Sequence, residues 1–310
     1  MATEPNDPHS SGTWQARPVR QRKRLVTGIY VQRPQTDQIA TCIDEIRGNR
    51  AYLTEPTVLL LTGDTGLGKS TFLKKYAKKS RRRRVAGRVK QPIIYMEMPT
   101  QATPLAAAEL LLKLLGDPRS ERGRLSSREF RIVELLKAER VEIVLIDEFQ
   151  HIIEASGASR LNAVANLIKQ VVKQAGVPLL LCGMPEVKAI VEGHPQLAGI
   201  CDLRFEMEAF SHDTDAGRLA LRIFLRDYDR HLPFDQLSRL GSPDIAEALG
   251  CASGGNMRRL IRLLWRAAFR AIERGAPSIQ TEDLEEAFAR VMHTYNQRTN
   301  VFTTLRKHDG

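Results

Sequence analysis

Residues 63–70 have the sequence Gly-Asp-Thr-Gly-Leu-Gly-Lys-Ser, which matches the GxxxxGK[ST] pattern of loops that wrap phosphate groups. Glycines allow backbone N–H groups to point at a phosphate without a clash from a Cβ atom. Lys69 would contact the β- and γ-phosphates of a nucleotide, and the Ser70 hydroxyl would ligate Mg²⁺. The residues expected to bind ATP are Gly63, Asp64, Thr65, Gly66, Leu67, Gly68, Lys69, Ser70 and Thr71.

A second candidate element is the apolar stretch 141–146, which ends in the acidic pair Asp147 and Glu148. A carboxylate at the end of a strand beside the phosphate loop can hold the Mg²⁺ shell, and we assign this role to Asp147. Glu148 is placed to polarise the attacking water as a general base. Acidic pairs also end strands by chance, but their occurrence after a phosphate loop favours ATP hydrolysis with Lys69 and Glu148 as catalytic residues.

These residues require strands and helices that alternate along the chain. Apolar segments of strand length alternate with segments of helical periodicity as far as Phe210. This pattern predicts an α/β fold with a parallel five-stranded sheet flanked by helices. The expected strands are 57–62, 93–98, 142–146, 177–182 and 203–207, and the expected helices are 35–48, the helix from the loop to Lys79, 104–116, 127–140 and 160–175.

After Phe210 the alternation stops, and the remaining segments are helical. Helices are expected at 213–229, 242–250, 256–274 and 281–293. The predicted organisation is a flexible basic N-terminal arm (1–28), an α/β ATPase domain (29–210), an α-helical lid domain (211–295) and a polar C-terminal tail (296–310).

The formal net charge is +11, and the excess is concentrated in two segments. Residues 1–28 carry five basic and two acidic side chains, and residues 74–90 carry ten basic side chains and no acidic one. Such asymmetry suits a polyanion such as nucleic acid, although charge runs are often only solvated faces.

Neither a membrane nor a structural metal is indicated by the sequence. No apolar run approaches the ~20 residues that cross a bilayer, and no secretory signal is visible, so a cytoplasmic location without a membrane partner is expected. The four cysteines lack metal-ligand spacing and are expected to be buried, reduced side chains: Cys42, Cys182, Cys201 and Cys251.

The loop, the Asp-Glu strand and the helical lid together resemble an AAA+ ATPase. Residues 145–186 resemble more narrowly the TniB/TnsC transposition regulators, relatives of the MuB ATPase. The resemblance implies that Arg204 contacts the nucleotide of a neighbouring subunit and that Arg258, with Arg259 as the alternative, contacts the γ-phosphate from the lid. The sequence departs from the AAA+ pattern at the end of the fourth strand, where Cys182 replaces a polar sensor residue.

Binding to double-stranded DNA is expected through phosphates and without sequence preference, because no recognition motif is present. Two basic clusters are candidates. Charge density favours the cluster Lys78, Arg81, Arg82 and Arg83, whereas the resemblance favours the segment with Lys113, Arg119, Arg122, Arg124 and Arg128. The sequence does not decide between them.

The resemblance implies an ATP- and Mg²⁺-dependent protein that forms a head-to-tail ring or filament of itself on duplex DNA, captures target DNA, and recruits a transposase and a TniQ-type protein. Hydrolysis, weak and stimulated by DNA or a partner, would disassemble it. The alternatives are a helicase loader or initiator-type AAA+ ATPase, and a slow-hydrolysing, nucleotide-switched scaffold, which the missing polar sensor residue leaves open.

Overall fold

The computed structural model describes residues 13–50, 52, 57–80, 82–85, 88–100, 103–151, 166–168, 173–193, 195–199, 201–292 and 300–305. The chain forms two compact units. Residues 34–208 form the α/β unit, and residues 1–33 together with 209–310 form the helical unit.

The α/β unit is built on a parallel five-stranded sheet in the order β4-β5-β6-β1-β7. The β1, β4, β5 and β6 strands are apolar almost throughout, as expected for strands covered on both faces. The prediction of a five-stranded parallel sheet is therefore confirmed. The strands are β1 (Val58–Thr62), β4 (Ile93–Glu97), β5 (Ile143–Asp147), β6 (Leu179–Cys182) and β7 (Cys201–Glu206).

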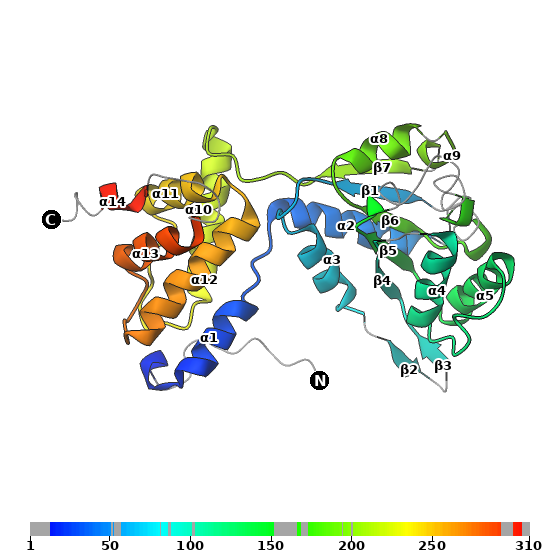
Figure 1. Cartoon of the computed structure of the whole chain (residues 1–310), viewed down its shortest axis with the longest axis horizontal. Coiled ribbons are helices and arrows are strands. Elements are labelled where there is room, and N and C mark those ends of the chain that lie inside the picture. Colours follow the sequence, from blue (N-terminus) through cyan, green and yellow to red (C-terminus); the bar gives the residue numbers. More distant parts are fainter. Residues whose placement is uncertain are drawn as a thin grey trace. The chain divides into compact units, whose positions relative to one another are not determined.

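Helices flank the parallel sheet (Figure 1), and alternate residues of β1 belong to two separate cores. Leu59 and Leu61 pack with apolar residues of α2 (Pro34–Asn49) and α3 (Lys69–Ala77). Val58 and Leu60 belong to the opposite core, to which three further helices contribute: α4 (Pro104–Leu114), α5 (Leu125–Ala138) and α8 (Glu186–Gly193).

An antiparallel hairpin, β2 (Arg83–Val85) and β3 (Arg88–Lys90), follows α3 and was not predicted. Its strands consist almost entirely of arginine, lysine and valine, so they lack the apolar alternation that identifies a strand. The short helix α9 (Pro195–Ala198) precedes β7. Of the helix predicted at 160–175, only residues 166–168 and 173–175 lie among the described residues, and they are helical.

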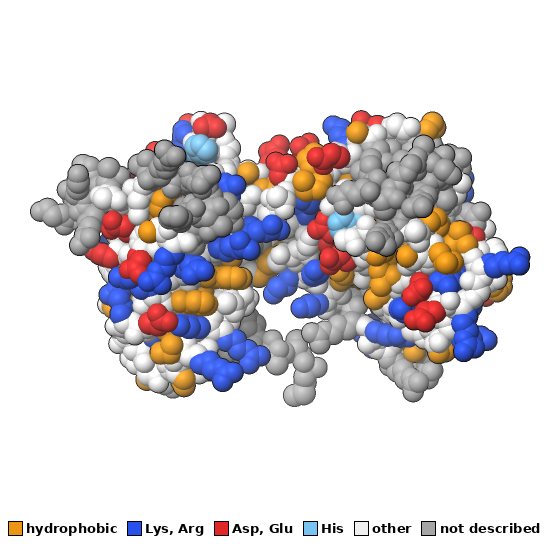
Figure 2. Space-filling view, in the orientation of Figure 1, with side chains coloured by type: hydrophobic (Ala, Val, Ile, Leu, Met, Phe, Trp, Pro, Cys, Tyr) orange, Lys and Arg blue, Asp and Glu red, His pale blue; other side chains and the backbone are white. Residues whose placement is uncertain are grey.

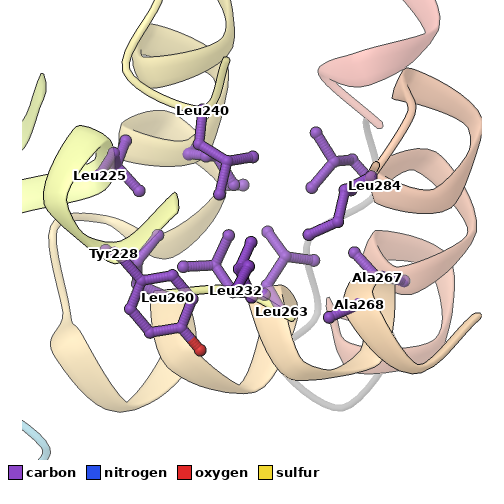
Figure 3. Packing of buried hydrophobic residues seen from close by; sticks show 14 of the residues in the cluster. Leu225, Tyr228, Leu232, Leu240, Leu260, Leu263, Ala267, Ala268 and Leu284 are labelled. Carbon is purple, nitrogen blue, oxygen red and sulfur yellow. The ribbon is translucent and has the colours of Figure 1, made fainter. Parts of the chain in front are cut away.

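The helical unit contains the predicted C-terminal helices with boundaries shifted by at most three residues. Thr214 caps α10 by accepting from Gly217 N, and Asn256 caps α12 by accepting from Arg258 N and Arg259 N. The core contains leucines of α10, α12 and α13 together with Tyr228 (Figure 3). The helices are α10 (Asp215–Arg230), α11 (Pro243–Ser253), α12 (Met257–Glu273), α13 (Thr281–Met292) and the short α14 (Phe302–Leu305).

The N-terminal segment differs from the flexible arm expected for residues 1–28. A 3₁₀ turn, η1 (Trp14–Ala16), precedes the helix α1 (Val19–Gly28), which packs on α12 within the helical unit. Val26 lies in the core, and Arg22, which is 2% exposed, donates through Nε to Pro233 O at 3.0 Å. Its guanidinium also stacks on the Phe234 ring at 5.1 Å. Residues 1–12 lie outside the described part of the chain.

The C-terminal tail predicted from residue 296 also contains a packed element. Phe302 of α14 is fully buried and contacts Phe288 edge-on, with ring centroids 6.0 Å apart. Among the helices that the structure describes, none is both long and apolar enough to cross a membrane.

Candidate functional site

The loop between β1 and α3 has the backbone that a phosphate-binding loop needs. Gly66 and Gly68 have φ values of +82° and +99°, in the region that favours glycine. At Gly63, an added Cβ would lie 2.4 Å from the carbonyl oxygen of Met207. Gly68 is the N-cap of α3 and has no side chain that could accept from the first N–H groups of the helix. An anionic ligand can therefore occupy this helix N-terminus.

Lys69 lies over this loop. Its side chain is buried, at 8% exposure, and its Nζ donates to the carbonyl oxygens of Gly63 and, at 2.8 Å, Asp64. Ser70 follows in the first turn of α3 and is half-buried, and Thr71 is exposed. The loop thus places an ammonium, a hydroxyl and a helix N-terminus together, as the sequence pattern predicted.

The carboxyl end of β5 carries the predicted acidic pair. Asp147 is 1% exposed, and each of its oxygens accepts a hydrogen bond. Glu148 N donates to Oδ1 at 3.0 Å, and the Tyr95 hydroxyl donates to Oδ2 at 2.8 Å. Only β6 separates β5 from β1 in this parallel sheet. The acidic pair and the phosphate loop therefore both lie at the carboxyl ends of the strands, on the same side of the sheet.

Tyr95 was not predicted as a site residue. It lies in β4, where the register places Glu97 opposite Asp147. Burial raises the pKa of the Tyr95 hydroxyl well above its usual range, and the hydrogen bond to Asp147 raises it further. The phenol therefore remains a donor at physiological pH. Its one sequence signal is a tyrosine two residues before the glutamate that ends an otherwise apolar strand.

Cys182, at the carboxyl end of β6, is fully buried. Burial raises the pKa of its thiol well above the usual value, and the nearby Asp147 charge adds to the shift. The thiol is therefore neutral. Cys182 thus ends the strand as predicted, with a buried thiol at the position where the AAA+ pattern has a polar sensor residue.

The two arginines assigned through the resemblance lie in different units. Arg204 is in β7 with a partly exposed side chain, and its Nη1 lies 2.6 Å from Glu192 Oε1 of α8. Arg258 is exposed in the first turn of α12 in the helical unit, followed by Arg259. Their contacts with a nucleotide remain predictions.

Several residues predicted to contact DNA have partners within the α/β unit. Arg82 Nη2 donates to Leu115 O at 3.1 Å and to Glu139 at 2.8 Å. Lys113 forms ion pairs with Glu109 at 2.8 Å and Glu121 at 3.1 Å. Arg128 is buried and donates to backbone carbonyls of Leu105, Glu121 and Gly123. Arg128 is thus a structural residue, and Arg81 lies outside the described residues.

The remaining predicted DNA contacts are exposed side chains. These side chains are Lys78, Arg83, Arg119, Arg122 and Arg124. None of them forms an ion pair with another described residue. In Figure 2, basic side chains over the α4 and α5 region are interrupted by acidic ones. The two basic clusters also meet, because a Cβ added at Gly116 would lie 2.6 Å from the Arg82 guanidinium. Arg82, the residue before the hairpin, therefore contacts the start of the loop that carries Arg119, Arg122 and Arg124.

Comparison with solved structures identifies the fold. The chain is similar to Cdc6p of Pyrobaculum aerophilum, with 17% identity, a TM-score of 0.60, and 87% of this chain and 71% of that chain covered. It is also similar to the ORC2 protein of Aeropyrum pernix, solved in ADPNP-ADP complexes, with 16% identity, a TM-score of 0.67 and 89% and 74% covered. The ORC1 protein of Aeropyrum pernix, solved in complex with DNA, gives 17% identity, a TM-score of 0.58 and 87% and 69% covered.

These similarities show the fold of the AAA+ P-loop ATPases, with the parallel sheet and the C-terminal helical region. No protein among curated sequences matches this chain. The profile of the bacterial TniB proteins, however, matches residues 24–212, which is more than half of the sequence. By this match, the chain belongs to the bacterial TniB protein family.

Proposed function

We propose that this protein binds ATP with Mg²⁺ and hydrolyses it. The observation that carries the proposal is the position of Lys69 over the glycine loop, on the same sheet edge as Asp147 and Glu148. Nucleotide binding would exchange the carbonyl partners of the Lys69 ammonium for phosphate oxygens. Charge-assisted hydrogen bonds from an ammonium to phosphate are stronger than those to neutral carbonyls, so the exchange favours the bound state.

Ser70 and Asp147 would hold the Mg²⁺. Among the described residues, no group of three or more His, Cys, Asp or Glu side chains could hold a metal ion alone. A metal site that is completed by phosphate oxygens fits this donor set. When bound, Mg²⁺ would neutralise charge on the phosphates, and Glu148 would accept the proton of the attacking water.

Lys69→Ala tests the proposal directly. We expect a loss of about 10- to 100-fold in ATP affinity, because one or two charge-assisted hydrogen bonds to phosphate disappear. Lys78→Ala is a matched control, since Lys78 is an exposed lysine at the C-cap of the same helix. Isothermal titration calorimetry with ATP and Mg²⁺ measures both. Equal affinities for the wild type and the Lys69→Ala variant would refute nucleotide binding at this loop.

We further propose that the ATP-bound protein assembles head to tail on duplex DNA and regulates transposition. Support comes from membership of the TniB family and from the exposed basic side chains of the α/β unit. Subunits that associate through two different surfaces form open helices when the rotation between them does not close. Arg204 is the residue proposed to reach the neighbouring subunit's nucleotide, and Arg258 is the one proposed to contact the γ-phosphate.

The assembly would mark target DNA and recruit a transposase and a TniQ-type protein, and hydrolysis would disassemble it. Negative-stain imaging and sedimentation of the protein with DNA and ATP test the assembly. A protein that stays monomeric under these conditions excludes it. Co-purification with a replicative helicase instead of a transposase would favour a helicase loader.

The buried thiol of Cys182 favours one second candidate, a nucleotide-switched scaffold that hydrolyses ATP slowly. ATP turnover measured with and without DNA separates the two functions. Turnover that DNA stimulates and that Glu148→Gln lowers sharply to a residual rate supports the ATPase cycle. Nucleotide binding without turnover supports the switch.

A further inference from the structure

The backbone at Glu148 is turned sharply as the chain leaves β5. Glu148 has a φ of +55°, in the left-handed region that a residue with a side chain seldom adopts. Two hydrogen bonds fix the turn: Glu148 N donates to Asp147 Oδ1 at 3.0 Å, and Phe149 N donates to Cys182 O at 2.9 Å. The starting direction of the Glu148 side chain is therefore set by backbone contacts.

The carboxamide of Gln150 connects the Glu148 carboxylate to the end of β6. Gln150 is buried, its Nε2 donates to Glu148 Oε2, and its Oε1 accepts from Met184 N at 3.2 Å. A backbone N–H is only a donor, so Oε1 must face Met184 and the amino group must face Glu148. The orientation of the carboxamide is thus determined by its contacts.

Gly183 makes room for this connection. A Cβ added at residue 183 would lie 2.6 Å from Gln150 Oε1 and 2.5 Å from Val187 Cγ2. Any side chain at this position would therefore push the carboxamide away from Met184. The glycine, the glutamine and the glutamate form one connected arrangement at the carboxyl ends of β5 and β6.

We infer that Gln150 is a positioning residue for ATP hydrolysis, which holds the Glu148 carboxylate in place by tethering it to the backbone at the end of β6. The inference rests on the proposed ATPase function. Among the described residues, only Oε2 of Glu148 has a hydrogen-bond donor, which leaves Oε1 to accept a proton from water. The tether ends at Met184, two residues after Cys182 and just beyond the end of β6.

Two substitutions of Gln150 separate its two contacts. Gln150→Leu removes both, whereas Gln150→Glu keeps an acceptor for Met184 N but removes the donor to Glu148. For both variants we expect kcat for ATP to fall about 10- to 100-fold, because small displacements of a reacting group have effects of this size. We expect KM for ATP to stay within twofold, because neither contact involves the phosphate loop. A residue with a merely structural role would change the denaturation midpoint without this split.

A third variant displaces the carboxamide without altering Gln150. Gly183→Ala combined with Val187→Ala relieves the contact with Val187 and leaves the contact with Gln150 Oε1. This double variant is expected to lose kcat as the Gln150 variants do, and Val187→Ala alone is the control. A kcat equal to that of Val187→Ala alone would contradict the tether.

A double-mutant cycle tests whether Gln150 acts through Glu148. The single-turnover rate of Glu148→Gln combined with Gln150→Leu should equal that of Glu148→Gln alone, because no carboxylate remains to be positioned. The inference is overturned if turnover in the Gln150 variants rises or stays within twofold of the wild type, or if the two effects multiply. Absence of turnover in the wild type itself would instead remove the proposed ATPase function.

Discussion

The Tyr95 hydroxyl donates to the carboxylate of Asp147 at 2.8 Å, across adjacent strands of the sheet. Tyr95→Phe leaves one oxygen of a buried carboxylate without its donor. We expect a loss of about 1–3 kcal/mol in the free energy of unfolding and a weaker affinity for ATP with Mg²⁺. Urea denaturation and titration calorimetry measure the two effects. Tyr52→Phe is the control, because Tyr52 is exposed, and a loss of the same size there would point to a non-specific cause.

Alkaline pH should destabilise the protein through its buried tyrosines. Burial raises the pKa of Tyr76 and Tyr95 above the ordinary value of about 10. Their contribution to stability is therefore complete below pH 10 and is lost as the pH rises, because the unfolded chain releases the protons first. Above pH 10, each tyrosine should lower the free energy of unfolding by about 1.4 kcal/mol per pH unit. The free energy of unfolding should fall less between pH 9 and pH 11 in Tyr76→Phe than in the wild type. An equal fall in both proteins would show that Tyr76 does not cause the alkaline loss of stability.

The salt dependence of DNA binding should identify the basic residues that contact phosphates. Each lost phosphate contact is expected to reduce the slope of log K against log salt by about 0.9. One variant reverses the charges of Arg119 and Arg122, and a second reverses those of Lys78 and Arg83. Fluorescence anisotropy measures the DNA affinity of each variant at several salt concentrations. A pair whose reversal leaves the slope unchanged does not contact the DNA backbone.

Arg82 should behave differently from its neighbour Arg83. Arg82→Ala removes the partner of Glu139, whose side chain is only 8% exposed, and a donor to Leu115 O. We expect a loss of about 1–3 kcal/mol in stability, since a buried carboxylate loses a charged hydrogen-bond partner. Arg83→Ala should stay within about 0.5 kcal/mol, as exposed substitutions usually do. Urea denaturation compares them, and equal stabilities would show that the ion pair has no structural role.

Substitutions in α1 test whether the N-terminal helix is part of the helical unit. Val26→Ala removes buried methyl groups, and we expect it to cost about 1–3 kcal/mol. Arg22→Ala removes a buried hydrogen bond and a ring contact, with a similar expected loss. Arg24, exposed on the same helix, supplies the control Arg24→Ala. Thermal denaturation that leaves all three variants equal to the wild type would mean that α1 is not held in place.

The sheet and the phosphate loop were predictable because their signals are local. Apolar strands of five residues and the glycine spacing of residues 63–70 are visible without knowledge of distant contacts. The helix expected after the loop has a local signal too, because its buried residues Phe72, Leu73 and Tyr76 recur at helical spacing. The site residue Asp147 was also predictable, because an apolar strand that ends in a carboxylate is visible in the local sequence alone.

The remaining features depend on contacts between residues that are distant in sequence. Tyr95 is a site residue only because β4 pairs with β5, where Tyr95 lies opposite Leu145 and its hydroxyl reaches Asp147 two residues further along. Gln150 depends on Gly183 and Met184, more than thirty residues away. The packing of α1 depends on Val26 and on the guanidinium of Arg22, which contacts Pro233 and Phe234 far along the chain, so a basic segment near the N-terminus gave no local sign of it.

The helical unit is assembled from two ends of the chain, with the whole of residues 34–208 between them. During translation at ~5–20 residues per second, α1 is synthesised roughly 11 to 46 s before the first residue of α12, the helix on which it packs. A helix of ten residues is only marginally stable in water by itself. All strands of the sheet are synthesised by residue 208, so the α/β unit can fold first. The α1 helix has no partner on which to pack until α12 has been synthesised.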